Sequence, residues 1–234
     1  MDVSGKKALV FGGTSGIGLA ATTQLAEMGA EVVAVSRDPA KAGPLPDGVT
    51  TRACDVLDRD ALAALFEECA PFDILVSAAT GGARAIGPFL SMDMDGFQGS
   101  FAKLWGYANV VRFGTPHMSD DGTVVLVSGS PARRSDLGMI AVGATGAAVE
   151  AMARSVALEI APRRINVVSP GIIDTPMNPL EGEAREKHYE SATSNRLVRR
   201  AGTAAEVAQA IVFVVQNDFV TGTTVDVDGG WLLA

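Results

Sequence analysis

Strand-like apolar runs alternate with helical patterns along the whole chain, and this alternation restricts the fold more than any other feature. The apolar runs are nearly continuous, which is typical of parallel strands that are covered on both faces. We therefore predict an α/β fold: one doubly wound Rossmann domain whose parallel sheet has helices on both sides. The predicted strands are 6–12, 31–36, 49–55, 73–78, 123–128, 164–170 and 223–228, and the predicted helices are 16–28, 58–69, 93–117, 142–161 and 203–216.

The length and punctuation of the chain favour a single domain. Its 234 residues suit one large α/β unit. No internal repeat, low-complexity segment or linker divides it. Residues 179–197 are polar and charged, so we expect a mobile lid at about 177–200.

A glycine-rich turn, FGGTSGIG at 11–18, follows the first predicted strand. Glycines at 12, 16 and 18 permit a tight turn and a close approach of the backbone to a ligand. The helix that follows presents free N–H groups and a dipole that favours an anion. In this position the turn predicts a pyrophosphate-binding loop for a dinucleotide.

The end of the second predicted strand indicates which dinucleotide binds. A carboxylate there would bind ribose hydroxyls, but the chain has Ser36 and Arg37, which suit a 2′-phosphate. We expect NADP(H) as the cofactor, with NAD(H) disfavoured, although Asp38 beside Arg37 opposes this. Asp55, after the third strand, is placed either to meet the adenine amino group or to cap the next helix.

Composition excludes several classes of function. The chain has 47% hydrophobic residues, 20% charged residues and a formal net charge of −8, which argues against nucleic-acid binding. Cys54, Cys69, His117 and His188 show no metal-ligand spacing, so we expect free thiols and no metal. The start MDVSGKKALVFGG lacks the pattern of a signal peptide, and no apolar run reaches the ~18 residues of a membrane span. We expect a cytoplasmic protein with no membrane partner.

Taken together, these residues resemble the short-chain dehydrogenase/reductase family over nearly the whole chain. The matching pieces are FGGTSGIG at 11–18, CDV at 54–56, DILVSAAT at 73–80, VVLVSGS at 124–130, INVVSPGIIDTP at 165–176, and GTAAEVAQAIVFV and TGTTVDVDGG toward the end. The resemblance implies a seven-stranded parallel sheet in the order 3-2-1-4-5-6-7, a nicotinamide cofactor, and a homotetramer or homodimer formed through two long helices.

The resemblance also implies cofactor-binding residues. The segment at 77–80 departs from the family's NNAG sequence, which puts local hydrogen bonding there in doubt. The implied positions are Gly12, Thr14, Ser15, Gly16, Ile17 and Gly18 at the pyrophosphate, Asp55 and Val56 at the adenine, Ser77, Ala78 and Ala79 at the ribose, and Pro170, Gly171, Ile172, Ile173 and Thr175 at the nicotinamide.

The tyrosine and lysine that carry proton transfer in the family are absent. In the family, a tyrosine protonates the substrate oxygen, and a lysine one helical turn further on lowers the phenol pKa. The stretch AVGATGAAVEAM at 141–152 places Val142 and Gly146 at these positions, and neither side chain can titrate. Small residues on this helix, including Gly143, Gly146, Ala147 and Ala151, fit the family's subunit contact.

One substitution supplies a candidate replacement. The family's asparagine in the preceding long helix falls on Lys103, which can bring an ammonium into the space of the missing lysine. A partly buried lysine with a lowered pKa can donate a proton, although an amine that reaches out to solvent is the alternative. Ser128 and Ser130, which flank the family's serine position at Gly129, are the candidate groups for binding the substrate oxygen.

Other polar groups are weaker candidates. Tyr107 lies one turn beyond Lys103, and His188 and Tyr189 fall in the expected lid, so each is a further proton source or a structural residue. Arg133 and Arg134 follow the serine loop and either bind an anionic group of a substrate or form surface charge, and His117 is expected to be structural.

Two functions remain open from the sequence. The first is an NADP(H)-dependent oxidoreductase that interconverts a ketone and an alcohol, as small-molecule substrates, with a non-standard catalytic set. The second is a protein that keeps the nicotinamide site but performs a non-redox step, such as an isomerisation, or serves as a non-catalytic subunit.

Overall fold

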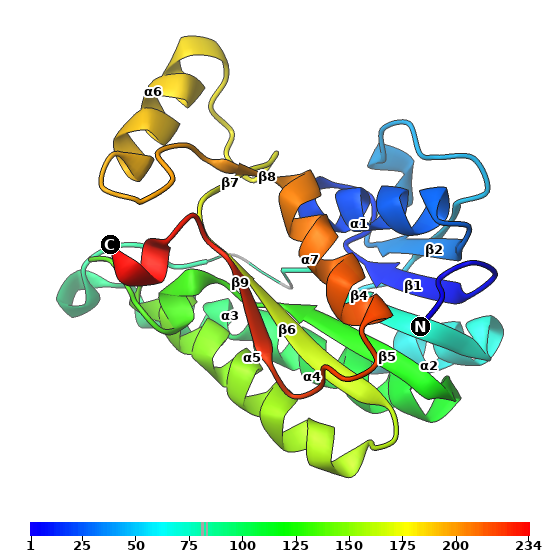
Figure 1. Ribbon diagram of the computed structural model, residues 1–234. Coiled ribbons are helices and arrows are strands. Elements are labelled where there is room, and N and C mark those ends of the chain that lie inside the picture. Colours follow the sequence, from blue (N-terminus) through cyan, green and yellow to red (C-terminus); the bar gives the residue numbers. More distant parts are fainter. Residues whose placement is uncertain (81, 83) are drawn as a thin grey trace.

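Seven parallel strands form one sheet in the computed structural model, which describes residues 1–80, 82 and 84–234 (Figure 1). The strand order is β3-β2-β1-β4-β5-β6-β9, and it confirms the predicted doubly wound sheet. The strand counted seventh from the sequence is β9, because β7 (Ile173–Asp174) and β8 (Gly202–Thr203) form a separate pair. The sheet strands are β1 (Lys7–Phe11), β2 (Glu31–Ser36), β3 (Thr50–Ala53), β4 (Phe72–Ser77), β5 (Met118–Val127), β6 (Arg164–Pro170) and β9 (Thr224–Val227).

Helices cover both faces of this sheet (Figure 1). Successive side chains of a strand point to opposite faces, so each strand feeds two cores. Along β1, Leu9 and Phe11 join one core, and Ala8 and Val10 join the other. The strands are apolar throughout because both faces are covered. The first core is closed by α2 (Arg59–Cys69), α4 (Ala102–Gly114) and α5 (Ile140–Glu159), and the second by α1 (Gly16–Glu27) and α7 (Ala204–Gln216).

Two predicted boundaries differ from the structure. The region predicted as one helix at 93–117 is two helices, α3 (Met94–Ser100) and α4, with Phe101 between them. Strand β5 begins at Met118 rather than at 123, because a register shift against β4 adds an irregular segment before the regular pairing. The polar residues of that segment, among them Asp120 and Asp121, do not resemble a buried strand in sequence.

The segment expected to form a lid contains a helix, α6 (Gly182–Thr193), which stands away from the sheet (Figure 1). Its residues are polar and mostly exposed, which explains why the sequence predicts no core helix there. Arg185 holds the segment before it in place by donating to the carbonyl oxygens of Asn178, at 2.6 Å, and Leu180, at 2.8 Å.

The glycines of α5 pack within the subunit. A Cβ on Gly143 would lie 2.7 Å from the carbonyl oxygen of Pro131, and a Cβ on Gly146 would lie 3.0 Å from the Cβ of Ala132. Both glycines therefore let α5 approach the short 3₁₀ turn at 130–132. The expectation that they serve a subunit contact is wrong for these two positions, whereas Ala147 is exposed.

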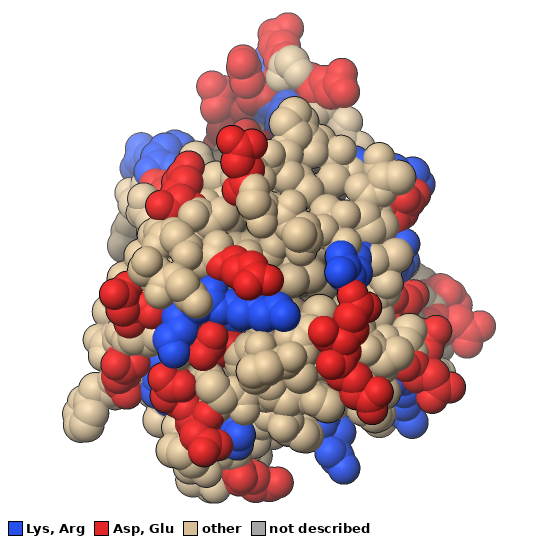
Figure 2. Space-filling model, turned by 90° about the vertical axis from the view of Figure 1, so that its right-hand side faces the viewer, with Lys and Arg blue, Asp and Glu red and all other residues tan. Residues whose placement is uncertain are grey.

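Acidic side chains are scattered over the surface, in keeping with the net charge of −8. Figure 2 shows one face of the molecule, on which the acidic side chains lie among uncharged residues and next to most of the Lys and Arg side chains. Within the described part of the chain, no helix combines the length and the apolar character needed to cross a bilayer.

Candidate active site

The loop between β1 and α1 depends on three glycines. Gly12 has φ +78° and Gly16 has φ +51°, a region that residues with a Cβ rarely adopt. A Cβ on Gly18 would lie 2.1 Å from the carbonyl oxygen of Gly12, so only glycine lets the first turn of α1 rest on this loop. Ser15 precedes α1 without a side-chain cap, which leaves the N–H groups of the first turn available to an anion.

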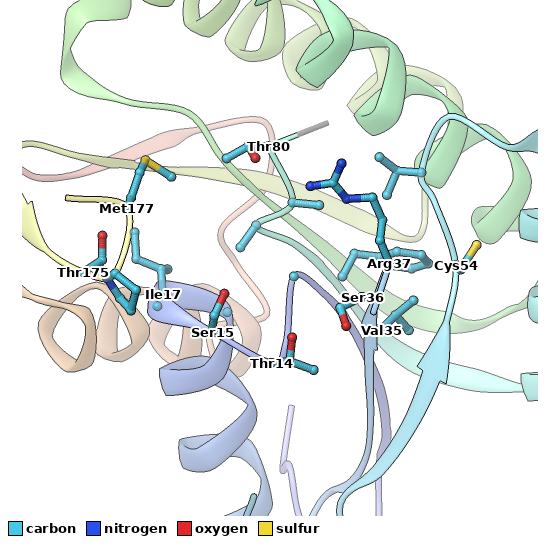
Figure 3. A pocket seen from close by; sticks show the side chains of 18 of the residues that line it. Thr14, Ser15, Ile17, Val35, Ser36, Arg37, Cys54, Thr80, Thr175 and Met177 are labelled. Atoms are coloured by element: carbon cyan, nitrogen blue, oxygen red, sulfur yellow. The ribbon is translucent and has the colours of Figure 1, made fainter. Parts of the chain in front are cut away.

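A cavity of about 360 Å³, the first cavity, lies over this loop at the carboxyl ends of the strands (Figure 3). Its wall contains every loop position that the resemblance assigns to the pyrophosphate, together with those assigned to the adenine. The predicted cofactor-binding residues that line the first cavity are Gly12, Thr14, Ser15, Gly16, Ile17, Gly18, Ser36, Arg37, Asp55, Val56, Ala78, Ala79 and Thr175.

Ser36 and Arg37 lie together in the wall of the first cavity. The hydroxyl of Ser36 is buried and has no hydrogen-bond partner among the described residues. The side chain of Arg37 extends from the end of β2 along the cavity (Figure 3). Asp38, which opposed the assignment of a phosphate here, pairs instead with Lys41 at 3.0 Å. The guanidinium of Arg37 therefore faces the space that a dinucleotide would fill, whereas the unpaired Ser36 hydroxyl has almost no exposed surface.

Asp55 lines the first cavity and does not cap α2. Its carboxylate accepts from the backbone N–H of Leu57 at 2.9 Å, while Asp58 caps the helix by accepting from the N–H of Ala61 at 3.0 Å. The capping alternative for Asp55 is therefore wrong. Ser77 is fully buried and is not among the lining residues of either cavity, so its predicted position beside the ribose is not met.

A second cavity, of about 400 Å³, adjoins the first, and Ile17, Ala78, Thr80, Thr175 and Met177 line both. The second cavity also contains the positions that the resemblance assigns to the nicotinamide and to catalysis. These lining residues are Lys103, Ser128, Val142, Gly146, Pro170, Gly171, Ile172 and Ile173.

Lys103 reaches the second cavity from α4, and Val142 and Gly146 line the same cavity. Its ammonium donates to the carbonyl oxygen of Ser128 at 3.0 Å and lies 5.5 Å from the centre of the Tyr107 ring. Burial lowers the pKa of Lys103 from its usual 10.5 to about 7, and the positive charge of Arg84 adds to this effect. The amine thus lines the cavity and is held by the backbone rather than reaching into solvent.

The hydroxyl groups of the two candidate serines are directed to protein acceptors. Ser128 donates to the carboxylate of Glu150 at 3.0 Å, and Ser130 donates to the carbonyl oxygen of Pro170 at 3.2 Å. Ser128 lines the second cavity, whereas Ser130 is fully buried and is not among its lining residues. Each hydroxyl has a single proton, so neither can donate to a substrate without releasing its present partner.

Arg133 and Arg134 both contact the protein, and neither is among the lining residues of the first or the second cavity. Arg133 forms ion pairs with Asp226 and with Glu150, the latter at 3.3 Å. Arg134 donates to the carbonyl oxygen of Trp231 at 2.7 Å. The expectation that these two arginines bind a substrate anion is therefore wrong for this conformation.

The aromatic candidates differ in burial and hydrogen bonding. Tyr107 is among the lining residues of the second cavity but is fully buried; its hydroxyl donates to the carbonyl oxygen of Val127 at 3.0 Å, and burial raises the pKa of the phenol, which favours a structural role. His117 stacks on Phe66 outside the cavities, as expected. His188 and Tyr189 come from α6 and line the second cavity. The hydroxyl of Tyr189 is buried there without a hydrogen-bond partner among the described residues.

Sequence reasoning missed two charged groups. Glu150 is 3% exposed and links Ser128 to Arg133, and Arg84 lines the second cavity. The sequence gives only weak signals for these two groups. Glu150 is the single acid in the small-residue stretch AVGATGAAVEAM, and Arg84 is the single arginine in the glycine-rich loop after β4. Among the described residues, no group of three or more His, Cys, Asp or Glu side chains could hold a metal ion.

The sheet order and the two adjoining cavities at the carboxyl ends of the strands are those of an α/β fold of the dinucleotide-binding class. A family model described as enoyl-(acyl carrier protein) reductase matches residues 12–232. The chain therefore belongs to the short-chain dehydrogenase/reductase family of oxidoreductases, whose members use a nicotinamide cofactor.

Individual relatives agree with this assignment. The 3-oxoacyl-[acyl-carrier-protein] reductase FabG of Thermotoga maritima is 32% identical, with both chains covered completely. A solved small-chain dehydrogenase in complex with NADPH superposes with a TM-score of 0.86 at 29% identity, covering 99% of this chain and 100% of the other. A solved short chain dehydrogenase/reductase family protein superposes with a TM-score of 0.83 at 32% identity, covering 98% of each chain.

Proposed function

We propose that the protein is an NADPH-dependent reductase that converts a ketone to an alcohol, with Lys103 as the proton donor. The observation that carries the proposal is the position of the Lys103 amine, which lines the second cavity beside Val142 and Gly146, where the family's tyrosine and lysine are missing. The reverse reaction, oxidation of the alcohol, would use the same groups.

The choice of NADP(H) rests on the first cavity. Arg37 offers charge and hydrogen bonds to a 2′-phosphate, and the unpaired Ser36 hydroxyl would add a hydrogen bond by rotating toward it. Asp38 would repel that phosphate, but its charge is partly neutralised by Lys41 at 3.0 Å. The solved relative that contains NADPH supports the same choice.

In this proposal, Lys103 donates the proton. When bound, the cofactor supplies a hydride to the carbonyl carbon. The carbonyl oxygen takes a proton from the Lys103 ammonium, and the neutral amine regains a proton from solvent. A proton donor is most effective when its pKa lies near the working pH, and the pKa of Lys103, about 7, meets this condition. Contact between the hydride donor and the carbonyl carbon provides a large share of the rate in its own right.

Ser128 positions Lys103, and Glu150 positions Ser128. The carbonyl oxygen of Ser128 holds the amine, and the hydroxyl of the same residue is held by the buried Glu150 carboxylate. Ser130 supports the nicotinamide end indirectly, because it donates to the carbonyl oxygen of Pro170. In this arrangement the two serines act through other groups and do not donate to the substrate.

Two further features complete the proposal. Segment 177–200 is a lid that carries His188 and Tyr189 to the substrate, and the unpaired Tyr189 hydroxyl would find its hydrogen-bond partner there. The protein assembles as a homodimer or homotetramer through α4 and α5, where Trp105 and Leu158 are 59% and 85% exposed.

The alternative is a protein that binds the cofactor without a redox step. It is favoured by Val142 and Gly146, which bring no titratable group to the usual place. The two functions differ in turnover and not in binding, so both must be measured.

Fluorescence titration with NADPH and NADH tests binding, and the loss of NADPH absorbance with a panel of ketones tests turnover. The proposal expects tighter binding of NADPH, turnover in the wild type, and a loss of kcat of at least about 100-fold in Lys103→Ala, the lower range of general acid catalysis. Lys7→Ala is the matched control, because Lys7 begins β1 at the opposite end of the strands.

Chemical rescue adds a readout that a structural role would not move. Millimolar ammonium or methylamine should restore activity to Lys103→Ala but not to Lys103→Met, which fills the space with an apolar chain. Turnover by the wild type with an unimpaired Lys103→Ala variant would refute the role of Lys103. Tight NADPH binding without any turnover would favour the non-redox alternative.

A further inference from the structure

The second cavity is positively charged inside an acidic protein. The chain has a net charge of −8, yet Arg84 and Lys103 line this cavity and no Asp or Glu is among its described lining residues. A concave site with charge of one sign concentrates ligands of the opposite sign. The cavity therefore favours negatively charged ligands, although the net negative charge of the whole protein repels them.

The two cations in the cavity differ from three basic groups around it. Arg133 pairs with Asp226, Arg185 with Asp174, and Arg196 with Asp136, whereas Arg134 donates to a backbone carbonyl oxygen. Among the described residues, no carboxylate lies within ion-pair distance of Arg84 or Lys103.

The two cations also repel each other. The charge of Arg84 helps to lower the pKa of Lys103, and burial lowers the pKa of Arg84 as well. Like charges that share a site without a counter-ion destabilise it, and an anion placed between them removes the repulsion. A negative group in the cavity would therefore be favoured, although Arg84 is also exposed to water.

The remaining wall limits the size and the polarity of that ligand. Most of the other lining side chains are apolar, including Met139, Val142, Ile172 and Met177. The volume of about 400 Å³ must also receive the nicotinamide ring, so the room left suits a small molecule. A guanidinium matches a carboxylate through two parallel hydrogen bonds, which an ammonium does not do.

We infer that the substrate is a small oxo acid, whose carboxylate is bound by Arg84 while its ketone oxygen faces Lys103. The carboxylate offsets the charge of Arg84, and the apolar wall receives the alkyl part of the molecule. This inference deepens the proposed function and rests on the same cavity. It separates the work of the two cations: Arg84 selects the substrate, and Lys103 protonates it.

Turnover tests the inference with pairs of substrates that differ only in charge. 2-Oxobutanoate and 3-oxobutanoate are compared with their methyl esters, through the loss of NADPH absorbance. For whichever of the two acids is reduced more efficiently, we expect its kcat/KM to exceed that of its methyl ester by at least tenfold. Arg84→Gln should bring this ratio of kcat/KM values close to one. Arg84→Lys should keep part of the preference. Arg59→Gln, at an exposed position that begins α2, is the matched control.

Binding tests the inference without turnover. The chain has two tryptophans, and Trp231 lines the second cavity while Trp105 is exposed on α4. In a Trp105→Phe background, Trp231 reports on the cavity by fluorescence. Oxamate, a non-reducible oxo-acid mimic, should bind in the presence of NADPH at least tenfold more tightly than its methyl ester, and Arg84→Gln should abolish the difference.

The outcomes separate this inference from the proposed function. Binding of oxamate with an Arg84-dependent preference, but without reduction of any oxo acid, supports the anionic ligand and overturns the redox proposal. Reduction of esters as efficiently as acids overturns the oxo-acid inference and leaves the redox proposal standing. An acid preference that survives Arg84→Gln, or no preference in either assay, also overturns the inference.

Discussion

The pH dependence of ketone reduction gives a direct test of Lys103 as the proton donor. Burial lowers its pKa from 10.5 to about 7, so the acid form that donates the proton predominates only below about pH 7. The fraction of ammonium then falls to roughly a tenth at pH 8 and roughly a hundredth at pH 9. An unperturbed lysine would remain protonated across this range. Reduction should therefore lose about tenfold in kcat/KM for each pH unit above 7, and alcohol oxidation should gain over the same interval.

The assay is kcat/KM for NADPH consumption between pH 5.5 and 9.5 with a neutral ketone, which avoids titration of the substrate. The profile of kcat/KM reports groups of the free enzyme. Lys103→Met should be slow and should lose the decline above pH 7. A wild-type rate that stays level to pH 9, or a decline that persists in Lys103→Met, would refute the assignment.

Four further predictions concern single residues. Lys103→Met should raise the free energy of unfolding by about 1–3 kcal/mol at pH 6, where the folded wild type holds an incompletely hydrated charge. The gain should shrink toward pH 10, because above about pH 7 the folded amine is neutral while the unfolded amine, with its usual pKa of 10.5, still binds a proton, so the stability of the wild type rises with pH; thermal melts at the two pH values measure this. Arg37→Gln should weaken NADPH binding by about tenfold to a hundredfold and leave NADH binding nearly unchanged in fluorescence titrations, since hydrogen bonds to charged groups contribute about 1.5–3 kcal/mol. Gly18→Ala should destabilise the protein by about 1–3 kcal/mol and abolish NADPH binding, because its Cβ would lie 2.1 Å from the carbonyl oxygen of Gly12; retained affinity by calorimetry would contradict this. Glu150→Gln should cost about 1–3 kcal/mol in urea denaturation, since it removes the charge from a buried ion-paired carboxylate.

The fold could be predicted from the sequence because each strand is buried on both faces. A continuous apolar run is then the only pattern compatible with the sheet, and β2 and β6 have the bounds that the sequence predicts, 31–36 and 164–170. The start of β5 could not be predicted, because its first residues are polar and its register with β4 is irregular. Gly99 lies two residues before the break at Phe101, but it is inside α3 and so does not mark the boundary by itself.

The lining of the first cavity could largely be predicted, because the loop at 11–18 is shaped by backbone geometry, which glycine positions reveal. The hydrogen bonds around the second cavity could not be predicted as well, because the direction of a hydroxyl depends on its tertiary neighbours. Ser128 and Ser130 were predicted to bind the substrate oxygen, yet their protons go to Glu150 and to the carbonyl oxygen of Pro170. Glu150 itself has no sequence signature, since one acid in a helix is most often a surface residue.

The cost of keeping Lys103 in the cavity argues that the chamber is built for chemistry. A buried amine without a carboxylate partner destabilises the fold, and methionine would fill the same space without that cost. The compensation present is small: one carbonyl oxygen at 3.0 Å and the face of the Tyr107 ring at 5.5 Å. Strained or costly groups of this kind concentrate at functional sites, because stability is given up there for reactivity. An amine with these contacts is unfavourable for a purely structural subunit and well suited to a proton donor, which is why the redox function is preferred to the cofactor-binding alternative.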